Sequence, residues 1–329
     1  MNLGPASNSL SSPSPRSVPS PRGRTRVVAL LEALAPDEGY NLTALPSVRV
    51  LRSNRPLSRT PVLYDPGIVI VCQGTKRGYF GDRLYLYDEQ HYLAVSVPVP
   101  FSMETDASED RPLLALYLHL DFALAAELAE RIAHEGGAAS GVAPQSMMST
   151  PMEDAMRASV LRLLEALHRP LEAAVLGEGL LRELYFRVLT GAQGGAMREA
   201  LAMRGQFGRI GRALRLIHAN YAQRLDVRQL AREAGMSVPS FHSHFKAITR
   251  VSPMQYLKST RLHQARLLMV RRGMTAEAAG LAVGYGSASQ FSREFRRLFG
   301  STPAAEARRM RESFAIPAEF ADTPYVSSH

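Results

Sequence analysis

The sequence of 329 residues predicts an α+β protein: a strand-rich N-terminal part with flanking helices, then an all-α C-terminal part. Short apolar runs separated by Gly and Pro fill residues 45–120, and residues 121–195 follow a helical period. Further on, a pattern of two short helices occurs twice. We expect two domains. The predicted boundaries are a disordered tail at 1–24, a first domain at 25–200, a second domain at 205–313 and a C-terminal tail at 314–329.

The strand-rich segment is typical of a small sandwich or barrel. Gly67–Gln73 (GIVIVCQ) is an apolar, β-branched run, and Gly81-Asp82 is a hairpin turn between two further strands. Pro98 and Pro112 separate the strands that follow. Three helices are expected after residue 121, over Phe122–Ala133, Met152–His168 and Leu171–Leu189, with a loop over Gly136–Thr150.

The clearest pattern lies at 275–299. Thr275 can cap a first short helix, and Gly284 can end it with a positive φ. Ser287 can cap a second helix, with Gln290 completing a capping box. The apolar residues of this second helix recur at helical spacing and form one face, namely Phe291, Phe295, Leu298 and Phe299. A helix of small residues, a glycine turn and a helix with an aromatic back are typical of a helix-turn-helix.

A second copy lies upstream, at 226–249. Asp226 can cap its first helix, Gly235 ends that helix, and Ser237 can cap the next one. The apolar back of the second helix consists of Phe241, Phe245 and Ile248. Because the copies are offset by about fifty positions, this internal repeat is a stronger signal than either copy alone.

A long helix is predicted between the two copies. Ser252 can cap it, Pro253 suits its first position, and apolar residues recur at helical spacing as far as Val270. Eighteen helical residues span roughly 27 Å, and successive major-groove windows on one DNA face are about 34 Å apart. Such a connector could therefore place two recognition helices in adjacent turns of the groove.

The candidate DNA-contacting residues are the polar residues on the second helix of each copy, since the apolar face must pack inward. They are Pro239, His242, Ser243 and Lys246 in the first copy, and Ser289, Gln290, Ser292, Arg293 and Arg296 in the second. A merely solvated helix face is the alternative. Charge favours DNA, because residues 205–312 hold 19 Lys and Arg against 6 Asp and Glu, a net +13, whereas the remainder carries −4.

Composition predicts a cytoplasmic protein. Cys72 is the single cysteine, so no disulfide can form within the chain, as expected for a reducing compartment. There is no run of eighteen apolar residues and no signal segment, so we expect no membrane association.

These motifs resemble the AraC/XylS family of bacterial transcription regulators. The resembling segments are LAREAGMS (230–237), FHSHFK (241–246), SPMQYLKSTRLHQARLLM (252–269), AVGYGSASQFSREFRRLFG (282–300) and Pro303. Two features depart from the family pattern: Arg250 stands where a glycine is usual, and the usual aromatic residue after Pro303 is absent. Residues 61–101 and 107–121 resemble the N-terminal domain of one AraC subgroup, a cupin-like β-barrel.

The resemblance implies a DNA-binding transcription regulator, here taken as an activator, with two helix-turn-helix subdomains joined by a long helix. The implied partners are double-stranded DNA, RNA polymerase, a small-molecule effector and a second copy in a homodimer. The helices at 121–195 either pair subunits or only cap the barrel, and both interpretations stay open. No catalytic role and no cofactor are implied.

Two alternatives were weighed. A cupin-type metalloenzyme fused to DNA-binding helices needs paired histidines on the strands, but His91 and His119 are isolated. His242 and His244 are two apart on a helix and face different directions, so no metal site is predicted. A thiol-based electrophile sensor would use Cys72, which alternates within an apolar strand and is more simply a core residue.

Overall fold

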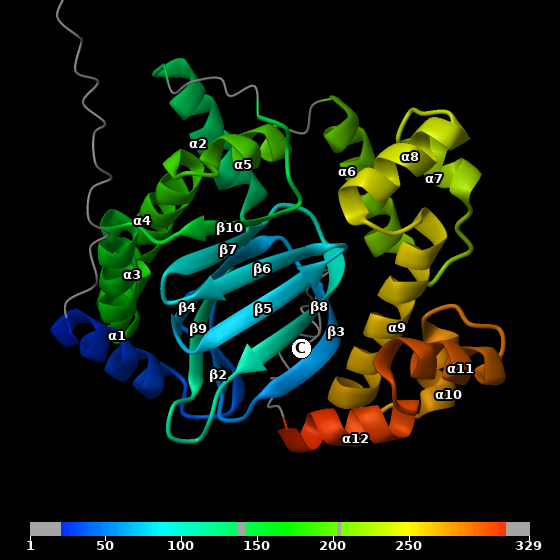
Figure 1. Cartoon of the computed structure of the whole chain (residues 1–329), viewed down its shortest axis with the longest axis horizontal. Coiled ribbons are helices and arrows are strands. Elements are labelled where there is room, and N and C mark those ends of the chain that lie inside the picture. Colours follow the sequence, from blue (N-terminus) through cyan, green and yellow to red (C-terminus); the bar gives the residue numbers. More distant parts are fainter. Residues whose placement is uncertain (1–20, 137–141, 203–204, 314–329) are drawn as a thin grey trace, which may run out of the picture.

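The computed structural model describes residues 21–136, 142–202 and 205–313. Within these ranges a curved antiparallel sheet lies between two groups of helices (Figure 1). Helices α1–α5 lie on one side of the sheet and helices α6–α12 on the other. The predicted division into a strand-rich N-terminal half and an all-α C-terminal half is confirmed.

The sheet runs in the order β1-β2-β9-β4-β7-β6-β5-β8-β3, and β10 pairs with β7 beside this path. The strands are β1 Gly39–Leu42, β2 Val48–Ser53, β3 Leu57–Tyr64, β4 Gly67–Gln73, β5 Thr75–Phe80, β6 Arg83–Asp88, β7 His91–Val95, β8 Val99–Asp106, β9 Leu113–His119 and β10 Met147–Pro151.

Both faces of β4 are buried, which explains its continuous apolar run. Ile68 and Ile70 point to a core shared with helices α1–α5, whereas Val69 and Val71 belong to the core on the opposite face. Alternate residues of a strand face opposite sides, so a strand covered on both sides needs apolar residues throughout.

The loop predicted over residues 136–150 is wrong in its last part. Met147–Pro151 forms β10, antiparallel to β7, with Met147 opposite Val95. Met147 and Met148 are both buried, one on each face. Sequence reasoning missed this strand because the Gly, Ala and Ser residues before it predict a loop. The strand is stabilised by pairing with β7 and not by local propensity.

Over its described residues, the N-terminal half also contains five helices, which pack on one another and on the sheet. They are α1 Pro21–Leu34, α2 Phe122–His134, α3 Asp154–Leu167, α4 Pro170–Thr190 and α5 Gly194–Leu201. The helix α1 begins at Pro21, so the last four residues of the expected tail 1–24 are helical; proline suits a first helical position. The rest of that tail, and the tail at 314–329, lie outside the described residues.

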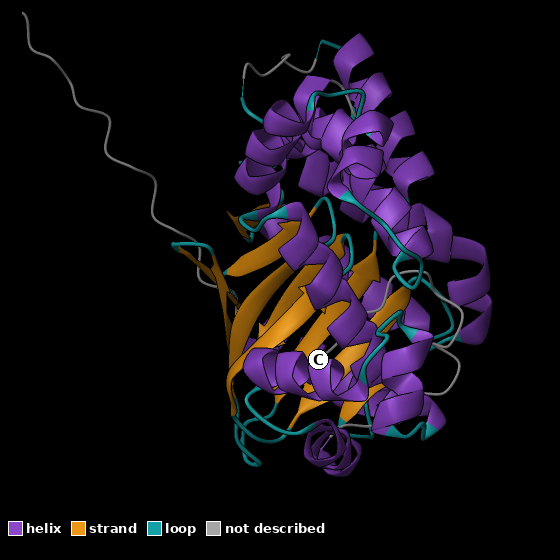
Figure 2. Cartoon of the chain, turned by 90° about the vertical axis from the view of Figure 1, so that its right-hand side faces the viewer, coloured by secondary structure: helices purple, strands orange, loops and turns teal. Residues whose placement is uncertain are grey.

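The C-terminal half consists of two small helical subdomains that share one long helix. Its helices are α6 Gly205–Asn220, α7 Val227–Glu233, α8 Val238–Thr249, α9 Pro253–Arg272, α10 Ala276–Ala282, α11 Ala288–Phe299 and α12 Pro303–Ser313. Figure 2 shows these helices lying across the sheet. The first subdomain shares its core with the sheet, whereas the second has a separate core built around Phe291 and Phe295.

The two halves are joined by hydrogen bonds as well as by apolar packing. The Tyr256 hydroxyl on α9 donates to the Pro98 carbonyl at 2.9 Å, and it also lies 2.7 Å from Nε2 of His218 on α6. Ser146 donates to the carbonyl of Ile248 at 2.8 Å. The sheet therefore contacts α9 and the end of α8 directly.

In the part of the chain that the structure describes, no helix is long and apolar enough to cross a membrane.

Candidate nucleic-acid interface

The second recognition helix, α11, is built largely as its sequence predicts. The Ser287 hydroxyl accepts a hydrogen bond from the backbone N–H of Gln290 at 3.3 Å. Thr275 caps the preceding helix α10 in the same way. Gly284 has φ +89°, and any Cβ there would collide with the carbonyl oxygen of Ala222. The expected capping box is only half formed, because the Gln290 amide side chain instead donates to Glu294 at 3.2 Å.

The first recognition helix, α8, differs at its start. Ser237 occupies the N-cap position, but its side chain makes no capping hydrogen bond. Pro239, in the first turn of the helix, removes one of the amide donors that an N-cap side chain normally binds. The preceding helix α7 compensates with a full capping box between Asp226 and Gln229.

The aromatic backs of both recognition helices are buried as predicted. Phe241 and Phe245 on α8, and Phe291 and Phe295 on α11, are each fully buried. The two rings are 5.3 Å apart in the first pair and 5.5 Å apart in the second. This equivalence supports the internal repeat and fixes the opposite face of each helix toward solvent.

All the residues predicted to contact DNA lie on exposed positions. They are Pro239, His242, Ser243 and Lys246 on α8, and Ser289, Gln290, Ser292, Arg293 and Arg296 on α11. The structure thus brings them into two polar helix faces, one in each subdomain.

A basic hollow adjoins the second of these faces. Arg293, Arg296 and Arg297 from α11 surround it with Thr302 and Pro303 at the start of α12, and it encloses about 570 Å³. Clustered guanidinium groups of this kind suit the phosphate oxygens of nucleic acid, because they donate several charge-assisted hydrogen bonds.

Glu294 holds α11 in place, and sequence reasoning missed it. Its carboxylate accepts hydrogen bonds from Lys258 on α9 at 2.9 Å and from the Tyr285 hydroxyl at 2.8 Å. Burial raises the pKa of Glu294, but hydrogen bonds led by that from Lys258 more than offset this, and the net shift is downward. The carboxylate is therefore charged at neutral pH. The sequence feature that could have identified Glu294 is an acidic residue between two arginines, Arg293 and Arg296.

The helix α8 ends at Arg250, which stands where the family usually has a glycine. Arg250 has φ +62°, and it alone among the described non-glycine residues has a positive φ. Its side chain lies against the hairpin turn at Gly81. If Gly81 carried a Cβ, that atom would lie 3.3 Å from Cγ of Arg250. The curved sheet, which forms a partial barrel, thus touches the residue that terminates the first recognition helix.

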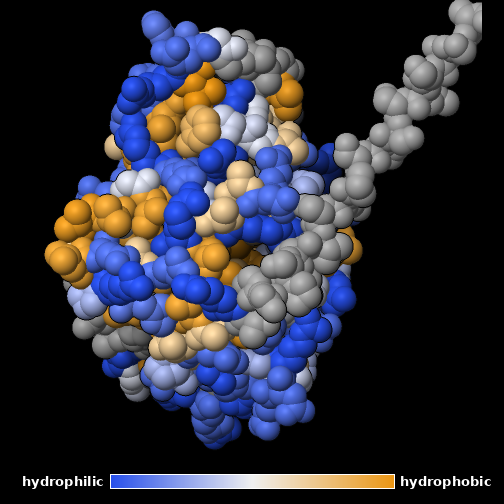
Figure 3. Space-filling model, turned by 90° about the vertical axis from the view of Figure 1, so that its left-hand side faces the viewer, coloured by the Kyte–Doolittle hydropathy of each residue, from blue (hydrophilic) through white to orange (hydrophobic). Residues whose placement is uncertain are grey.

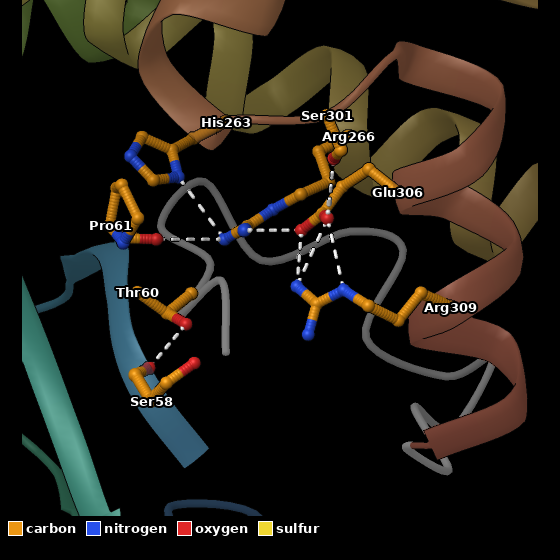
Figure 4. Close-up of polar contacts among 8 residues, drawn as sticks. All are labelled: Ser58, Thr60, Pro61, His263, Arg266, Ser301, Glu306 and Arg309. Carbon is orange, nitrogen blue, oxygen red and sulfur yellow. Dashed lines mark hydrogen bonds and ion pairs between the residues drawn. The ribbon is translucent and has the colours of Figure 1, made fainter.

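A second contact ties the barrel to the helices that carry α11. Arg266 on α9 is fully buried; it contacts Glu306 of α12 and donates to the Pro61 carbonyl of β3 at 3.3 Å (Figure 4). Its guanidinium also stacks 4.3 Å from the centre of the Phe299 ring. One side chain therefore joins the barrel, α9, α11 and α12.

The histidines considered for a metal site lie apart. On β7, Nδ1 of His91 lies 3.1 Å from the Asp88 carboxylate, and His119 is the last residue of β9. On α8, Nδ1 of His244 lies 2.8 Å from the Ser240 carbonyl oxygen. Among the residues that the structure describes, no three metal-ligating side chains converge.

Cys72 lies near the end of β4, partly buried among apolar residues. Burial raises the pKa of its thiol to about 12. Since the thiolate is the reactive form, this shift keeps the thiol protonated at neutral pH, which disfavours an electrophile sensor.

Comparison with known protein families agrees with this architecture. Residues 44–196 match the AraC-type transcriptional regulator N-terminus, and residues 230–309 match a helix-turn-helix domain. These features define a regulator of the helix-turn-helix class with an N-terminal barrel domain. The chain belongs to the AraC/XylS family.

Two curated relatives match part of the chain. The virulence regulon transcriptional activator VirF of Yersinia enterocolitica is 26% identical over 161 residues, 49% of this chain and 59% of VirF. The MmsAB operon regulatory protein of Pseudomonas aeruginosa is 33% identical over 89 residues, 27% of this chain and 29% of that protein. The matches thus cover about three-fifths or less of these relatives.

One solved structure matches over most of its length. Unsaturated fatty acid-bound ToxT from Vibrio cholerae superposes with a TM-score of 0.53, covering 85% of this chain and all of ToxT. The sequences are 10% identical, so this likeness establishes the fold alone.

Proposed function

We propose that the protein is a sequence-specific DNA-binding transcription regulator of the cytoplasm that reads adjacent major-groove turns with α8 and α11. The observation that carries this is the pair of exposed polar faces on α8 and α11, in equivalent positions of a structural repeat whose two copies are joined by the continuous helix α9. A 20-residue helix spans roughly 30 Å, close to the ~34 Å between successive groove windows.

The basic half supplies the affinity in this proposal. Its net charge of +13 and the hollow between Arg293, Arg296 and Arg297 suit a polyanion. Lysine and arginine contacts to phosphates release counterions, so binding must weaken steeply as salt rises.

The test uses the full-length chain and a library of genomic DNA fragments. We expect bound fragments to share two short motifs about one helical turn apart, and affinity to fall steeply from dilute to physiological salt. Lys246→Ala combined with Arg293→Ala should abolish enrichment, whereas Arg26→Ala, which removes an exposed charge on α1, should not. A flat salt dependence or enrichment without a shared motif would overturn the proposal.

Activation through RNA polymerase and control by a small-molecule effector form the second part of the proposal. The name of VirF describes a transcriptional activator, and the ToxT structure contains an unsaturated fatty acid. In this chain a groove of about 650 Å³ lies between the barrel and helices α9 and α11, and Lys258 and Arg297 line it beside Phe101. A ligand with an acidic head and an apolar body would touch both halves there.

This part is tested by DNA affinity in the presence of a cis-unsaturated C16 fatty acid. Occupancy should change operator affinity, because the groove borders α11. Ser102→Arg, at a half-buried position of β8 that lines the groove, narrows the groove and should remove the response while leaving unliganded binding near that of the wild type. Unchanged DNA affinity at saturating fatty acid would exclude this ligand class.

A homodimer completes the proposal. Family membership and the exposed helices of the regulatory half support it, and two copies would double the number of half-sites that are read. Sedimentation of the purified chain at micromolar concentration tests it, and a monomer at all concentrations would contradict it.

A further inference from the structure

The two helix-turn-helix subdomains touch each other beside α9 as well as sharing that helix. The contact joins the loop that follows α6, at residues 221–225, to the glycine turn that follows α10. A Cβ added at Gly284 would collide with the carbonyl oxygen of Ala222, so only glycine allows the loop and the turn to lie this close. Tyr221, at the start of the loop, packs against the apolar cores of both subdomains.

The equivalent turn of the first copy makes no such contact. Gly235 follows α7 as Gly284 follows α10, and both have a positive φ, +63° and +89°. Within 4 Å, a Cβ added at Gly235 would meet only the side chain of Arg212, at 3.9 Å. The glycine of the first turn therefore serves to end a helix, whereas that of the second also admits the neighbouring subdomain.

Arg261, a half-buried residue of α9, holds the loop and the turn together. Its Nε donates to the Tyr221 carbonyl at 2.7 Å, and its Nη2 donates to the Gln223 carbonyl at 2.8 Å. Its Nη1 donates to the Gly284 carbonyl at 3.4 Å. The first two carbonyls belong to the first subdomain and the third belongs to the second. One rigid, planar guanidinium thus spans the boundary between them.

The internal repeat shows that this role is particular to the second copy. Arg212 stands 23 residues before Gly235, as Arg261 stands 23 residues before Gly284. Arg212 donates to two carbonyls at the end of α7, at 3.3 and 3.4 Å, and both belong to its own subdomain. The equivalent arginine therefore fastens a helix end in the first copy and joins the two copies in the second.

This junction bears on how the two recognition helices meet DNA. The shared helix α9 sets how far apart α8 and α11 lie, but their rotation about α9 depends on the contacts beside it. One base pair inserted between two half-sites moves the second half-site by ~3.4 Å and turns it by ~35° about the DNA axis. Recognition helices that cannot rotate relative to each other cannot follow that change.

We propose that Arg261 sets the half-site spacing that this protein accepts, by clamping residues 221–225 to the turn at Gly284. It is a positioning residue, which acts through the relative orientation of α8 and α11 and contacts no base. This proposal rests on the proposed reading of DNA by both helices and adds the residue that makes their spacing specific.

The first experiment measures affinity for operators whose half-sites are moved closer or further apart by one base pair. Wild-type affinity should fall at least about tenfold for each change. Arg261→Lys keeps the positive charge but loses the guanidinium fork, so its affinity should fall at most about threefold. Arg212→Lys is the matched control and should keep the wild-type spacing profile, because the hydrogen bonds of Arg212 stay within one subdomain. A wild-type profile in Arg261→Lys would overturn the proposal.

A second variant leaves Arg261 in place. Gly284→Ala pushes the turn away from the Ala222 carbonyl and should also broaden or shift the preferred spacing. Gly235→Ala imposes a similar backbone strain at positive φ without a clash and should not. Thermal unfolding shows which variants fold. An unchanged preference in folded Gly284→Ala would count against the clamp.

The last measurement needs no DNA. Spin labels at Arg228→Cys on α7 and Leu281→Cys on α10, both exposed positions, report the distance between the subdomains in a Cys72→Ser background. Both helices lie away from the N-terminal helices, on whose side of the molecule apolar side chains are exposed among charged ones (Figure 3). An excess of unlabelled chain removes distances between copies.

The distance distribution should be narrow in the wild type and in Arg212→Lys, and broader in Arg261→Lys. Equal widths in all three would overturn the clamp whatever the DNA results. A wild type that binds DNA with no preference for spacing would instead overturn the reading by two helices, and with it the role of Arg261 in spacing. The two failures are therefore told apart.

Discussion

The guanidinium of Arg266 lies 3.3 Å from the carboxylate of Glu306, and each side chain is 1% exposed. Burial lowers the pKa of Arg266 to about 10, partly offset by Glu306, so the arginine is still charged at neutral pH. Arg266 also donates to the carbonyl of Pro61 on β3, so this buried pair couples the core of the second subdomain to the N-terminal half (Figure 4).

We predict that Arg266→Met strongly destabilises the protein. It leaves the Glu306 carboxylate buried with a weaker set of partners, and breaking a buried pair typically costs about 3–5 kcal/mol. Arg309→Met removes the other charged partner of Glu306, which is half-exposed, and should cost about 1 kcal/mol or less. Denaturant unfolding measures both, and equal losses would show that burial of Arg266 is unimportant.

We predict that Phe295→Ala destabilises the second subdomain by about 3–5 kcal/mol, because the ring is fully buried and packs 5.5 Å from Phe291 and 4.5 Å from Phe299. Leu281→Ala is the control, since that leucine is 73% exposed and its loss should be nearly neutral. Thermal melting that is unchanged in Phe295→Ala would refute the assigned orientation of α11.

Much of the DNA-binding half could be predicted from sequence because local chemistry encodes it. The caps at Asp226, Ser252 and Thr275 and the aromatic spacing of α8 and α11 act within a few residues, and the structure confirms them. Each of these signals is read from side chains within one or two helical turns.

What could not be predicted depends on residues distant in sequence. The strand β10 forms through pairing with β7, and Glu294 acts through Lys258, 36 residues away. Arg266 meets Pro61 across 205 residues. No periodicity or spacing rule reports such contacts, so the attachment of the barrel to α9 emerged only from the structure.

Acid should destabilise the fold through buried histidines. Burial lowers the pKa of His218 to about 3, and burial followed by the charge of Arg266 lowers that of His263 well below its usual value. Between about pH 6.5 and pH 3 the unfolded chain therefore binds more protons, so stability falls as pH falls, by up to ~1.4 kcal/mol per pH unit for each histidine.

The variant His218→Gln should flatten that slope, because glutamine cannot titrate but can still meet the Tyr256 hydroxyl. His168→Gln, which changes an exposed histidine, serves as the control. Melting temperatures measured from pH 7 to pH 4 decide the matter, and parallel curves for His218→Gln and the wild type would exclude His218 as a source of the acid sensitivity.

Arg293 and Arg296 of α11 should divide base recognition and phosphate contact between them. Both are exposed and line the basic hollow, but Arg293 lies nearer the N-terminal end of the helix, so it can contact base edges, whereas Arg296 is about one turn further on. Arg293→Ala should lose about 1–3 kcal/mol at one base pair and relax the preference there, while Arg296→Ala should weaken all sequences about equally. Selection from a randomised operator library measures both, and a base preference lost only in Arg296→Ala would reverse the assignment.

Arg250 and Gly300 end the two recognition helices at equivalent positions, with φ of +62° and +76°. A side chain in this left-handed region costs roughly 1–2 kcal/mol, which Gly300 avoids and Arg250 must bear. Arg250→Gly should therefore stabilise the protein by about 0.5–1 kcal/mol after the loss of its contact with the Gly81 turn, whereas Gly300→Ala, in open space, should destabilise it through φ alone. Denaturant unfolding of both variants gives the sign directly. If Arg250→Gly instead costs more than about 1 kcal/mol, the packing of the arginine stem on the barrel hairpin outweighs the strain, and the end of α8 is held by the regulatory half.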